Sequence, residues 1–319
     1  MSYQIMELRL SSDTAKRKRF FTAESFAHPA KMHIGLLEWI VFTFTQEGDV
    51  ILDPMLGSGT TLYAVLLGRS VIGVELEAKF IKMAEDNLAK LNQMPLYLGT
   101  KQRGQAQIIQ GDARQLEGLL VDKCIFSPPY AEVKQDDTHK PEGYWDKAGK
   151  IGHKPDMTPN NIENIGNLPY GNIDSIITSP PYESTVKHGD EGTSAHGHER
   201  PSYEERLANT RGYSESELNI GNLKSTSYLE SMALVYSQCY KVLKPQGLMI
   251  LIVKNFIRNK QEVRLDLDTI KLCEQAGFEL VERHYRKLTA QSFWRIIYQQ
   301  KYPDAPVLDK EDILVFRKD

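Results

Sequence analysis

The strongest constraint on the fold comes from three short apolar segments, each of which is followed by a carboxylate. The pairs of segment and acid are 50–52 with Asp53, 71–74 with Glu75, and 108–109 with Asp112. Apolar residues at helical spacing lie between the segments, over about 60–67 and 80–91. Alternating strand and helix signals predict parallel strands joined by helical crossovers. The sequence therefore predicts an α/β fold with a doubly wound, mostly parallel sheet, whose strands present their carboxyl ends at one edge.

The same rhythm resumes in the last third of the chain. Helical spacing covers 228–242 and 267–276, and a strongly apolar strand is predicted over 248–253, after a turn at 245–247. Three further strands are predicted to complete the sheet, at 278–281, 294–298 and 313–316. We therefore expect one catalytic domain over residues 1–319.

Two long polar stretches interrupt this pattern. Residues 131–172 and 183–225 are rich in Gly, Asn, His, Lys, Asp and Glu and lack sustained periodicity. Loops of this length inside a compact domain are usually functional or disordered. They are predicted to be insertions near the carboxyl edge of the sheet.

Composition excludes several classes of protein. No window approaches 18 apolar residues, and the N-terminus lacks the apolar region of a secretory signal, so we expect a soluble, cytoplasmic protein. The three cysteines, at 124, 239 and 273, are widely spaced, which argues against disulfides and CxxC metal sites. His188, His196 and His198 are attributed to a polar loop rather than to a metal site. With a net charge of −3, any nucleic-acid contact must be local.

A glycine-containing loop follows the first apolar segment. Residues 53–61 read Asp-Pro-Met-Leu-Gly-Ser-Gly-Thr-Thr and open a helical segment. Glycines let the backbone approach a ligand closely, and a helix N-terminus offers free N–H groups. A phosphate-binding P-loop requires a Lys before its Ser or Thr, and this loop has none, which argues against an NTPase.

The three acids fit a nucleoside. Glu75 lies 22 residues after Asp53, about where a ribose diol finds its carboxylate acceptor. Asp112 can accept a hydrogen bond from an adenine amino group. One acidic strand end is more often a helix cap, but three in succession predict a nucleoside pocket without a phosphate clamp.

Two blocks of sequence recur between the halves of the chain. The pattern Asp-x-x-Ile-x-Ser-Pro-Pro-Tyr occurs at 122–130 and at 174–182, an offset of 52. The pattern Asn-Ile-Gly-Asn-Leu occurs at 164–168 and at 219–223, an offset of 55. Two blocks at nearly one offset indicate a tandem duplication of a strand-plus-insertion unit, in preference to two unrelated Pro-Pro turns.

With these motifs the chain resembles S-adenosylmethionine-dependent methyltransferases of the amino-group DNA type, with a Rossmann-like sheet. The loop at 53–61 is similar to that family's cofactor loop, and residues 28–32 are similar to the motif that closes over the methionine end of the cofactor. Ser-Pro-Pro-Tyr is similar to the family's catalytic tetrapeptide, most often found in enzymes that act on cytosine N4. The resemblance assigns cofactor binding to His28, Pro29, Lys31, Asp53, Pro54, Gly57, Ser58, Gly59, Thr60, Thr61, Glu75, Asp112 and Ala113. It assigns catalysis to Ser179, Pro180, Pro181 and Tyr182, or to Ser127, Pro128, Pro129 and Tyr130.

The chemistry explains such a tetrapeptide. The exocyclic amine of cytosine is a poor nucleophile, because its lone pair is delocalised into the ring. A Ser hydroxyl and the carbonyl of the next Pro can accept hydrogen bonds from both amine N–H groups and aim the lone pair at the methyl group. Proline fixes φ and preorganises that carbonyl, and Tyr offers a stacking face to an extruded base.

The sequence favours cytosine N4 over other methyl acceptors. Methylation of cytosine C5 needs a Cys nucleophile; no cysteine here follows a Pro, and Cys124 lies in an apolar segment, which favours a core role. Adenine N6 methylation is the closest alternative, although its enzymes usually have Asp or Asn in place of Ser. An RNA amino-group methyltransferase and an inactive, cofactor-binding DNA-binding subunit are further alternatives.

Double-stranded DNA is the expected partner. The sequence does not determine the oligomeric state, for which a homodimer is one alternative. It also does not determine whether a cognate restriction endonuclease is a partner. Candidate DNA contacts are the basic run 16–19 and the cluster 283–287, with a solvated tail and a charged edge strand as the alternatives. No recognition domain follows the last predicted strand, so the insertions 131–172 and 183–225 are the candidate recognition elements.

The two tetrapeptides compete for one place in the sheet. Ser127 lies 15 residues after Asp112, a connection typical of adjacent strands. The copy at Ser179 follows a better strand, 173–178, and its preceding Thr resembles the N4-cytosine signature more closely. We therefore favour Ser179-Pro180-Pro181-Tyr182 as the catalytic copy.

Overall fold

The computed structural model describes residues 5–28, 31–123, 173–181, 219–223, 225–288 and 293–319. They form an eight-stranded sheet in the order β1-β9-β10-β6-β5-β2-β3-β4 and a two-stranded hairpin, β7-β8. The strands are β1 Glu7–Arg9, β2 Val50–Asp53, β3 Ser70–Glu75, β4 Ala106–Gln110, β5 Ile173–Thr178, β6 Leu243–Val253, β7 Phe256–Arg258, β8 Gln261–Val263, β9 Phe278–Lys287 and β10 Lys310–Lys318.

Most strand pairs in the large sheet are parallel. The exception is β10, which is antiparallel to both of its neighbours, β9 and β6. From β2 the chain moves outward through β3 to β4 and then returns to place β5 on the other side of β2. This reversal is the topological switch point of a doubly wound sheet, where ligands bind at the carboxyl ends of the strands. The predicted Rossmann-like, mostly parallel α/β fold is confirmed.

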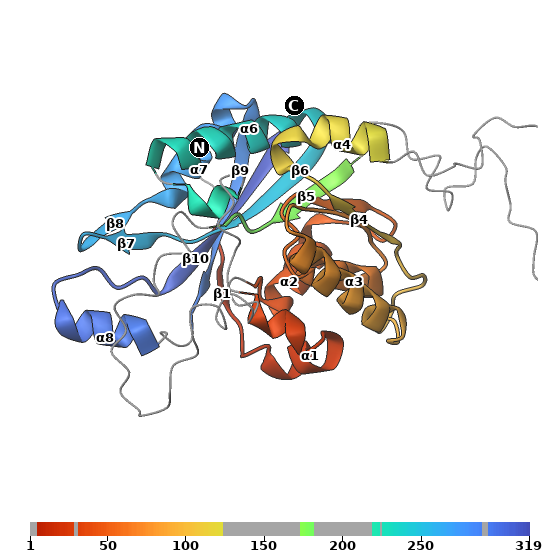
Figure 1. Cartoon of the computed structure of the whole chain (residues 1–319), viewed down its shortest axis with the longest axis horizontal. Helices are drawn as coiled ribbons and strands as arrows, with labels where there is room; N and C mark the ends of the chain where they lie inside the picture. Colours follow the sequence, from red (N-terminus) through yellow and green to blue (C-terminus); the bar gives the residue numbers. More distant parts are fainter. Residues whose placement is uncertain (1–4, 29–30, 124–172, 182–218, 224, 289–292) are drawn as a thin grey trace, which may run out of the picture.

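Helices cover both faces of the sheet (Figure 1). The α-helices are α1 Thr14–Phe20, α2 Ile34–Phe44, α3 Ala78–Asn92, α4 Leu116–Lys123, α6 Ser225–Val242, α7 Leu265–Gln275 and α8 Phe293–Lys301. The 3-10 helices are η1 Glu24–Ala27, η2 Thr60–Leu67, η3 Ala113–Gln115 and η6 Ile220–Asn222. One core lies between the sheet and α2, η2 and α3, and the other lies between the sheet and α4, α6 and α7. None of the described helices is both long and apolar enough to cross a membrane.

Strand β2 shows why the parallel strands have continuous apolar sequences. All four of its residues are buried. Ile51 packs into the core on the α2 side, whereas Val50 and Leu52 pack into the core on the α6 side. Because side chains alternate between the faces and both faces are covered, every residue of the strand must be compatible with burial.

The predicted strand at 294–298 is wrong, because this segment belongs to helix α8. Strands β9 and β10 pair directly with each other, so the segment that connects them has no place in the sheet. Ile296 and Ile297 are exposed, by 44% and 38%, which a strand buried on both faces would not allow.

The predicted turn at 245–247 lies within β6 instead of before it. Ile173 pairs with Leu243 and Ser175 pairs with Leu248, so the register shifts over the intervening residues. Gln246 has a φ of 62°, a local turn conformation. The Pro-Gln-Gly sequence therefore forms a bulge that keeps β6 paired with β5 on either side.

Candidate active site

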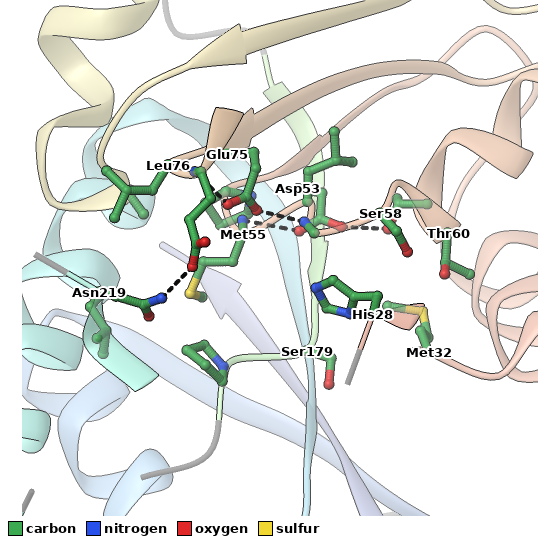
Figure 2. Close-up of a pocket in the computed structure, with 18 of the residues that line it drawn as sticks. His28, Met32, Asp53, Met55, Ser58, Thr60, Glu75, Leu76, Ser179 and Asn219 are labelled. Carbon is green, nitrogen blue, oxygen red and sulfur yellow. Dashed lines mark hydrogen bonds between the residues drawn. The ribbon is translucent and has the colours of Figure 1, made fainter. Parts of the chain in front are cut away.

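The strand ends of the parallel sheet surround one cavity of about 840 Å3, part of which is open to solvent. β2 ends at Asp53, β3 ends at Glu75, and Asp112 follows β4. Ser179 follows β5, the strand next to β2. The cavity is lined by His28, Met32, Asp53, Pro54, Met55, Leu56, Gly57, Ser58, Thr60, Thr61, Glu75, Leu76, Glu77, Gly111, Asp112, Ala113, Ser179, Pro181, Asn219 and Ile220. Figure 2 shows these side chains converging from both halves of the sheet.

Asp53 holds the loop after β2 in its shape. Its carboxylate accepts hydrogen bonds from the Thr61 hydroxyl and, at 3.2 Å, from the Met55 amide. The side chain is buried, and burial raises the pKa of Asp53. The hydrogen bonds join the two ends of the loop, which presents its middle to the cavity.

Gly57 brings the loop against the N-terminal segment. Its φ of 55° is in the left-handed region, and a Cβ at this position would lie 2.8 Å from Nε2 of His28. A larger residue would therefore be strained and would push His28 away from the loop. The His28 ring packs edge-on against Phe80 of α3, with 4.4 Å between ring centroids.

Glu75 is a buried carboxylate held by backbone amides. Its two oxygens accept hydrogen bonds from Gly57 at 2.8 Å and from Glu77 at 2.9 Å. Burial raises the pKa of Glu75 to about 7, although these amide hydrogen bonds act in the opposite direction. The side chain is thus fixed beside the loop at the end of β3, where the sequence places the acceptor for a ribose diol.

Asp112 lies in the cavity wall but is already paired. Its carboxylate caps η3 by accepting from the Arg114 amide at 2.9 Å, and it also accepts from the Arg114 guanidinium. The helix-cap interpretation of this acid is confirmed, and the cap still leaves Asp112 in the cavity lining with Ala113. Its role toward adenine remains a prediction.

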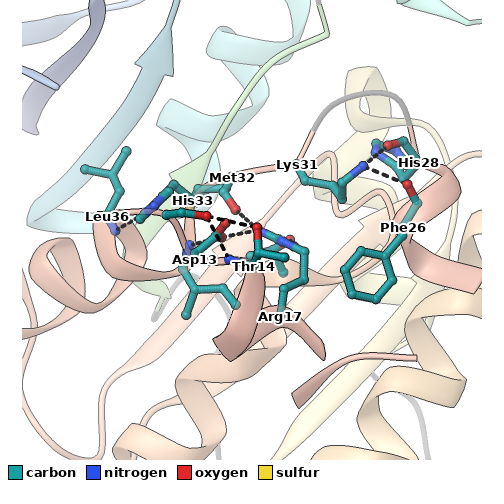
Figure 3. A network of polar contacts seen from close by, with 12 residues as sticks. Asp13, Thr14, Arg17, Phe26, His28, Lys31, Met32, His33 and Leu36 are labelled. Atoms are coloured by element: carbon teal, nitrogen blue, oxygen red, sulfur yellow. Dashed lines mark hydrogen bonds and ion pairs between the residues drawn. The ribbon is translucent and has the colours of Figure 1, made fainter. Parts of the chain in front are cut away.

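Polar contacts anchor the segment from Asp13 to His33 beside the cavity (Figure 3). Arg17 is buried and donates to the Met32 carbonyl at 2.6 Å and to Asp13 at 2.8 Å. Lys31 donates to the carbonyls of Phe26 and His28, and burial lowers the pKa of Lys31. Lys31 therefore contacts the segment itself and is not in the cavity lining. Gly59 does not line the cavity either, and Pro29 lies outside the described residues.

Asn87 is a positioning residue that the sequence patterns did not single out. It is fully buried on α3 and donates to the Ser58 carbonyl at 2.7 Å. Its side-chain oxygen accepts from the amide and hydroxyl of Thr22, at 2.8 and 2.9 Å. One amide group thus connects the cofactor-loop backbone to the N-terminal segment. A lone Asn in an amphipathic helix gives no local signal of this role.

Glu77 and Asn219 form a second group that the sequence analysis missed. The Asn219 amide donates to Glu77 at 2.5 Å, and its oxygen accepts from the Gly221 amide at 3.0 Å. Asn219 and Ile220 both line the cavity (Figure 2). They belong to the repeated Asn-Ile-Gly-Asn-Leu block, so the repeat was the available signal for this part of the wall.

The second Ser-Pro-Pro-Tyr segment reaches the cavity. β5 pairs with β2 on one side and with β6 on the other. Ser179 Oγ donates to the Ile252 carbonyl of β6 at 3.3 Å, and the buried Tyr228 hydroxyl donates to the Pro181 carbonyl at 2.9 Å. Tyr182 and all of Ser127-Pro128-Pro129-Tyr130 lie outside the described residues.

The cations proposed from sequence as DNA contacts are largely paired with carboxylates. Arg283 lies within 2.5 Å of Asp266 and 2.7 Å of Asp312. Arg286 and Lys16 pair with Glu311 and Glu38. β9 is not an edge strand, because β1 pairs with it on the side away from β10. The interpretation of 283–287 as a charged edge strand is therefore wrong. Because carboxylates already pair with most of these cations, few of them are free to contact a phosphate. The histidines at 188, 196 and 198 lie outside the described part of the chain.

The N-terminal part of the chain is similar to known DNA methylases. Residues 6–86 match the family model described as DNA methylase. The type II methyltransferase M2.DpnII of Streptococcus pneumoniae is 45% identical over 67 residues, 21% of this chain and 25% of that protein. The DNA adenine methyltransferase YhdJ of Escherichia coli is 38% identical over 68 residues, 21% of this chain and 23% of that protein. The chain thus spans about a quarter of the length of the curated relatives it matches.

Among solved structures, an S-adenosylmethionine-dependent methyltransferase from Methanosarcina mazei is 11% identical. The match covers 88% of this chain and 96% of that chain, with a TM-score of 0.42. The segment that matches the DNA methylase family contains His28, the 53–61 loop and Glu75. The chain is therefore similar to DNA methylases over its cofactor-loop segment, the segment for which the sequence predicts S-adenosylmethionine as the cofactor.

Proposed function

We propose that this protein transfers a methyl group from S-adenosylmethionine to an exocyclic amino group of a base in double-stranded DNA, with cytosine N4 as the acceptor. One observation carries the proposal: Ser179 and Pro181, at the end of the strand next to β2, line the same cavity as the cofactor loop and Glu75. A nucleophile held at Ser179 and a cofactor held at Glu75 would therefore share one enclosure.

The residues of the cavity fit this cofactor. Of the described side chains in the lining, four are carboxylates, at Asp53, Glu75, Glu77 and Asp112, and none is Lys or Arg. Such a wall offers acceptors for the hydroxyl and amino groups of a nucleoside, and without a lining cation it disfavours a nucleotide phosphate.

Ser179 has the hydrogen-bonding polarity that the reaction needs. Its hydroxyl proton is directed to the Ile252 carbonyl, so its oxygen lone pairs can accept a hydrogen bond from the base amine. Tyr228 holds the Pro181 carbonyl, and both prolines restrict the backbone, so residues 179–181 are preorganised. When bound, S-adenosylmethionine supplies an electrophilic methyl group, so no covalent enzyme intermediate is required. As the nitrogen–methyl bond forms, the sulfur–methyl bond would break, and the methylated amine would release one proton to solvent.

Adenine N6 methylation is a second candidate for the same site. It is favoured by the similarity to YhdJ, which is named a DNA adenine methyltransferase, although that similarity covers only 21% of this chain. Ser at position 179 favours cytosine, because the resemblance links Ser-Pro-Pro-Tyr most often with N4 enzymes. The insertions 131–172 and 183–225 are our proposed source of sequence readout, and a restriction endonuclease is a proposed partner.

The base identity is tested directly by the product. Duplex DNA incubated with the protein and methyl-labelled cofactor is digested to nucleosides and separated by mass spectrometry. We expect label in N4-methylcytosine. Label in N6-methyladenine would move the assignment to the second candidate, and labelled RNA with unlabelled DNA would indicate an RNA methyltransferase. If the protein binds the cofactor but labels neither DNA nor RNA, it is an inactive subunit.

We also predict that cofactor affinity depends on pH through Glu75. Its raised pKa of about 7 means that the carboxyl group takes up a proton as the pH falls through neutrality. The ionised form is the better acceptor for ribose hydroxyls, so cofactor affinity should fall below about pH 7, by up to roughly tenfold per pH unit. Calorimetric titration between pH 6 and 8 measures this. Glu75→Gln, which does not titrate, should remove the dependence; an equally steep profile in that variant contradicts the assignment.

A further inference from the structure

A short hairpin leaves the sheet directly beside Ser179. Ile252, whose carbonyl accepts from Ser179, is the penultimate residue of β6. The hairpin β7-β8 begins at Phe256 and ends at Val263. Figure 1 shows β7-β8 and α8 projecting beyond the sheet on the same side. At about 3.3 Å per residue, the three-residue strands reach roughly 10 Å outward.

Helix α8 lies next to the tip of this hairpin. Lys260 at the tip lies 4.6 Å from the ring centroid of Tyr302, which directly follows α8. Lys301 lies 5.4 Å from the same centroid, and the rings of Tyr302 and Tyr298 are 5.0 Å apart. We call residues 254–264 together with 293–302 the basic arm. The contact of Lys260 with the Tyr302 ring joins its two parts.

The basic arm has a strong local charge in a protein whose net charge is −3. Its sequence contains one acid, Glu262. Its cations are Lys254, Arg258, Lys260, Arg264, Arg295 and Lys301. Lys260 and Lys301 contact an aromatic ring, and no carboxylate among the described residues pairs with them. Within the arm, Arg264 pairs with Asp266 and Glu262. Elsewhere, Arg17, Arg283 and Arg286 each pair with a carboxylate.

Lys260 occupies a backbone position that does not suit a lysine. Asn259 and Lys260 have φ values of 51° and 63°, as in the two-residue turns that usually take Asn-Gly. A side chain at the second position costs conformational energy that glycine avoids. The fold thus places a positive charge at the hairpin tip in spite of a local cost, which is typical of residues with a function.

We propose that the basic arm binds the sugar-phosphate backbone of duplex DNA next to the base held at Ser179. This proposal rests on the proposed function. Charge complementarity supports it, because phosphates pair with Lys and Arg, and the adjoining Tyr298 and Tyr302 provide the aromatic faces common at nucleic-acid surfaces. The arm leaves the sheet at the mouth of the proposed catalytic site, where the strands flanking an extruded base must pass.

The test uses the full chain, a fluorescent duplex and DNA affinity measured by anisotropy at several salt concentrations. Lys260→Gly removes the charge and suits the positive φ, so the hairpin should fold at least as well, which thermal unfolding checks. We expect Lys260→Gly and Lys301→Ala each to weaken binding by roughly tenfold at 0.1 M salt and to lower the salt slope by about 0.9. Lys260→Arg should retain the wild-type slope. Lys271→Ala, which removes an exposed lysine on α7, is the matched control.

The outcomes separate this inference from the proposed function. If the wild type binds and methylates the duplex while both charge-removing variants keep its affinity and salt slope, the basic arm is not a phosphate contact. If Lys271→Ala weakens binding as much as Lys260→Gly, the effect is general charge and the inference is also overturned. If the wild type neither binds nor methylates DNA, the proposed function itself is wrong.

Discussion

Replacing Ser179 by Ala is expected to lower the rate of methyl transfer by about a hundredfold, the usual effect of removing one preorganised hydrogen-bond partner from a reacting group. The Ser179 oxygen is positioned by its hydrogen bond to Ile252 and lines the cofactor cavity. Its loss would leave the base amine with one acceptor fewer while the cofactor pocket stays intact. Single-turnover kinetics with saturating cofactor measure this effect, and calorimetric titration of the cofactor checks that the pocket is unchanged.

The matched control is the same substitution in the other copy, Ser127→Ala. It removes the same hydroxyl from the same local sequence, so we expect near wild-type turnover. A second pair repeats the comparison: Tyr182→Ala should lose the stacking face for the extruded base, worth about 1–3 kcal/mol, and Tyr130→Ala should not. Inactive Ser127→Ala and Tyr130→Ala proteins, with active Ser179→Ala and Tyr182→Ala proteins, would make the first copy the catalytic one.

Replacing Glu75 by Ala is expected to weaken cofactor binding by about a hundredfold while changing DNA affinity little. A buried carboxylate that accepts two ribose hydroxyls contributes roughly 1.5–3 kcal/mol per charged hydrogen bond. Alanine also leaves the amides of Gly57 and Glu77 without the acceptor they now have, so the loop should lose stability. Thermal unfolding reports that loss separately from cofactor affinity, which is measured by calorimetric titration.

Two variants sharpen this result. Glu75→Gln keeps the side-chain size and one oxygen acceptor, so it should fold nearly as well as the wild type and still bind cofactor weakly. Asp112→Ala should have a smaller effect on cofactor binding, because the Asp112 carboxylate is already paired with Arg114 and is more exposed than Glu75. Unchanged cofactor affinity in both Glu75 variants would remove Glu75 from the cofactor site.

Several features were determined by the local sequence. Apolar segments ending at Asp53 and Glu75 predicted β2 and β3, because a parallel strand buried on both faces has a continuous apolar sequence. The acids then had to lie at one edge, since parallel neighbours present their carboxyl ends together. Helical spacing over 267–276 likewise predicted α7, which is followed by Gly277, and the φ of 105° at Gly277 shows why a glycine stands there. In each case the physical cause acts within a few residues.

Other features were decided only by tertiary structure. The two Ser-Pro-Pro-Tyr copies have nearly the same local residues, and it is the pairing of Ile51 with Ser175 that places β5 beside β2. Segment 294–298 has apolar residues suited to a strand or a helix. Because β9 pairs directly with β10, no strand from this segment fits between them, and the segment forms helix α8.

Contacts between residues distant in sequence had no local signal. Asn219 reaches Glu77 across 142 residues, and Arg283 meets Asp266 and Asp312. Both contacts exist because buried polar and charged groups must find partners wherever the packed chain provides them. The sequence by itself thus determined the strands, the loop and the acids at the sheet edge, where short-range sterics and burial act. The packed chain decided which segments line the cavity and which cations are paired with carboxylates, because pairing and burial depend on residues far apart in sequence.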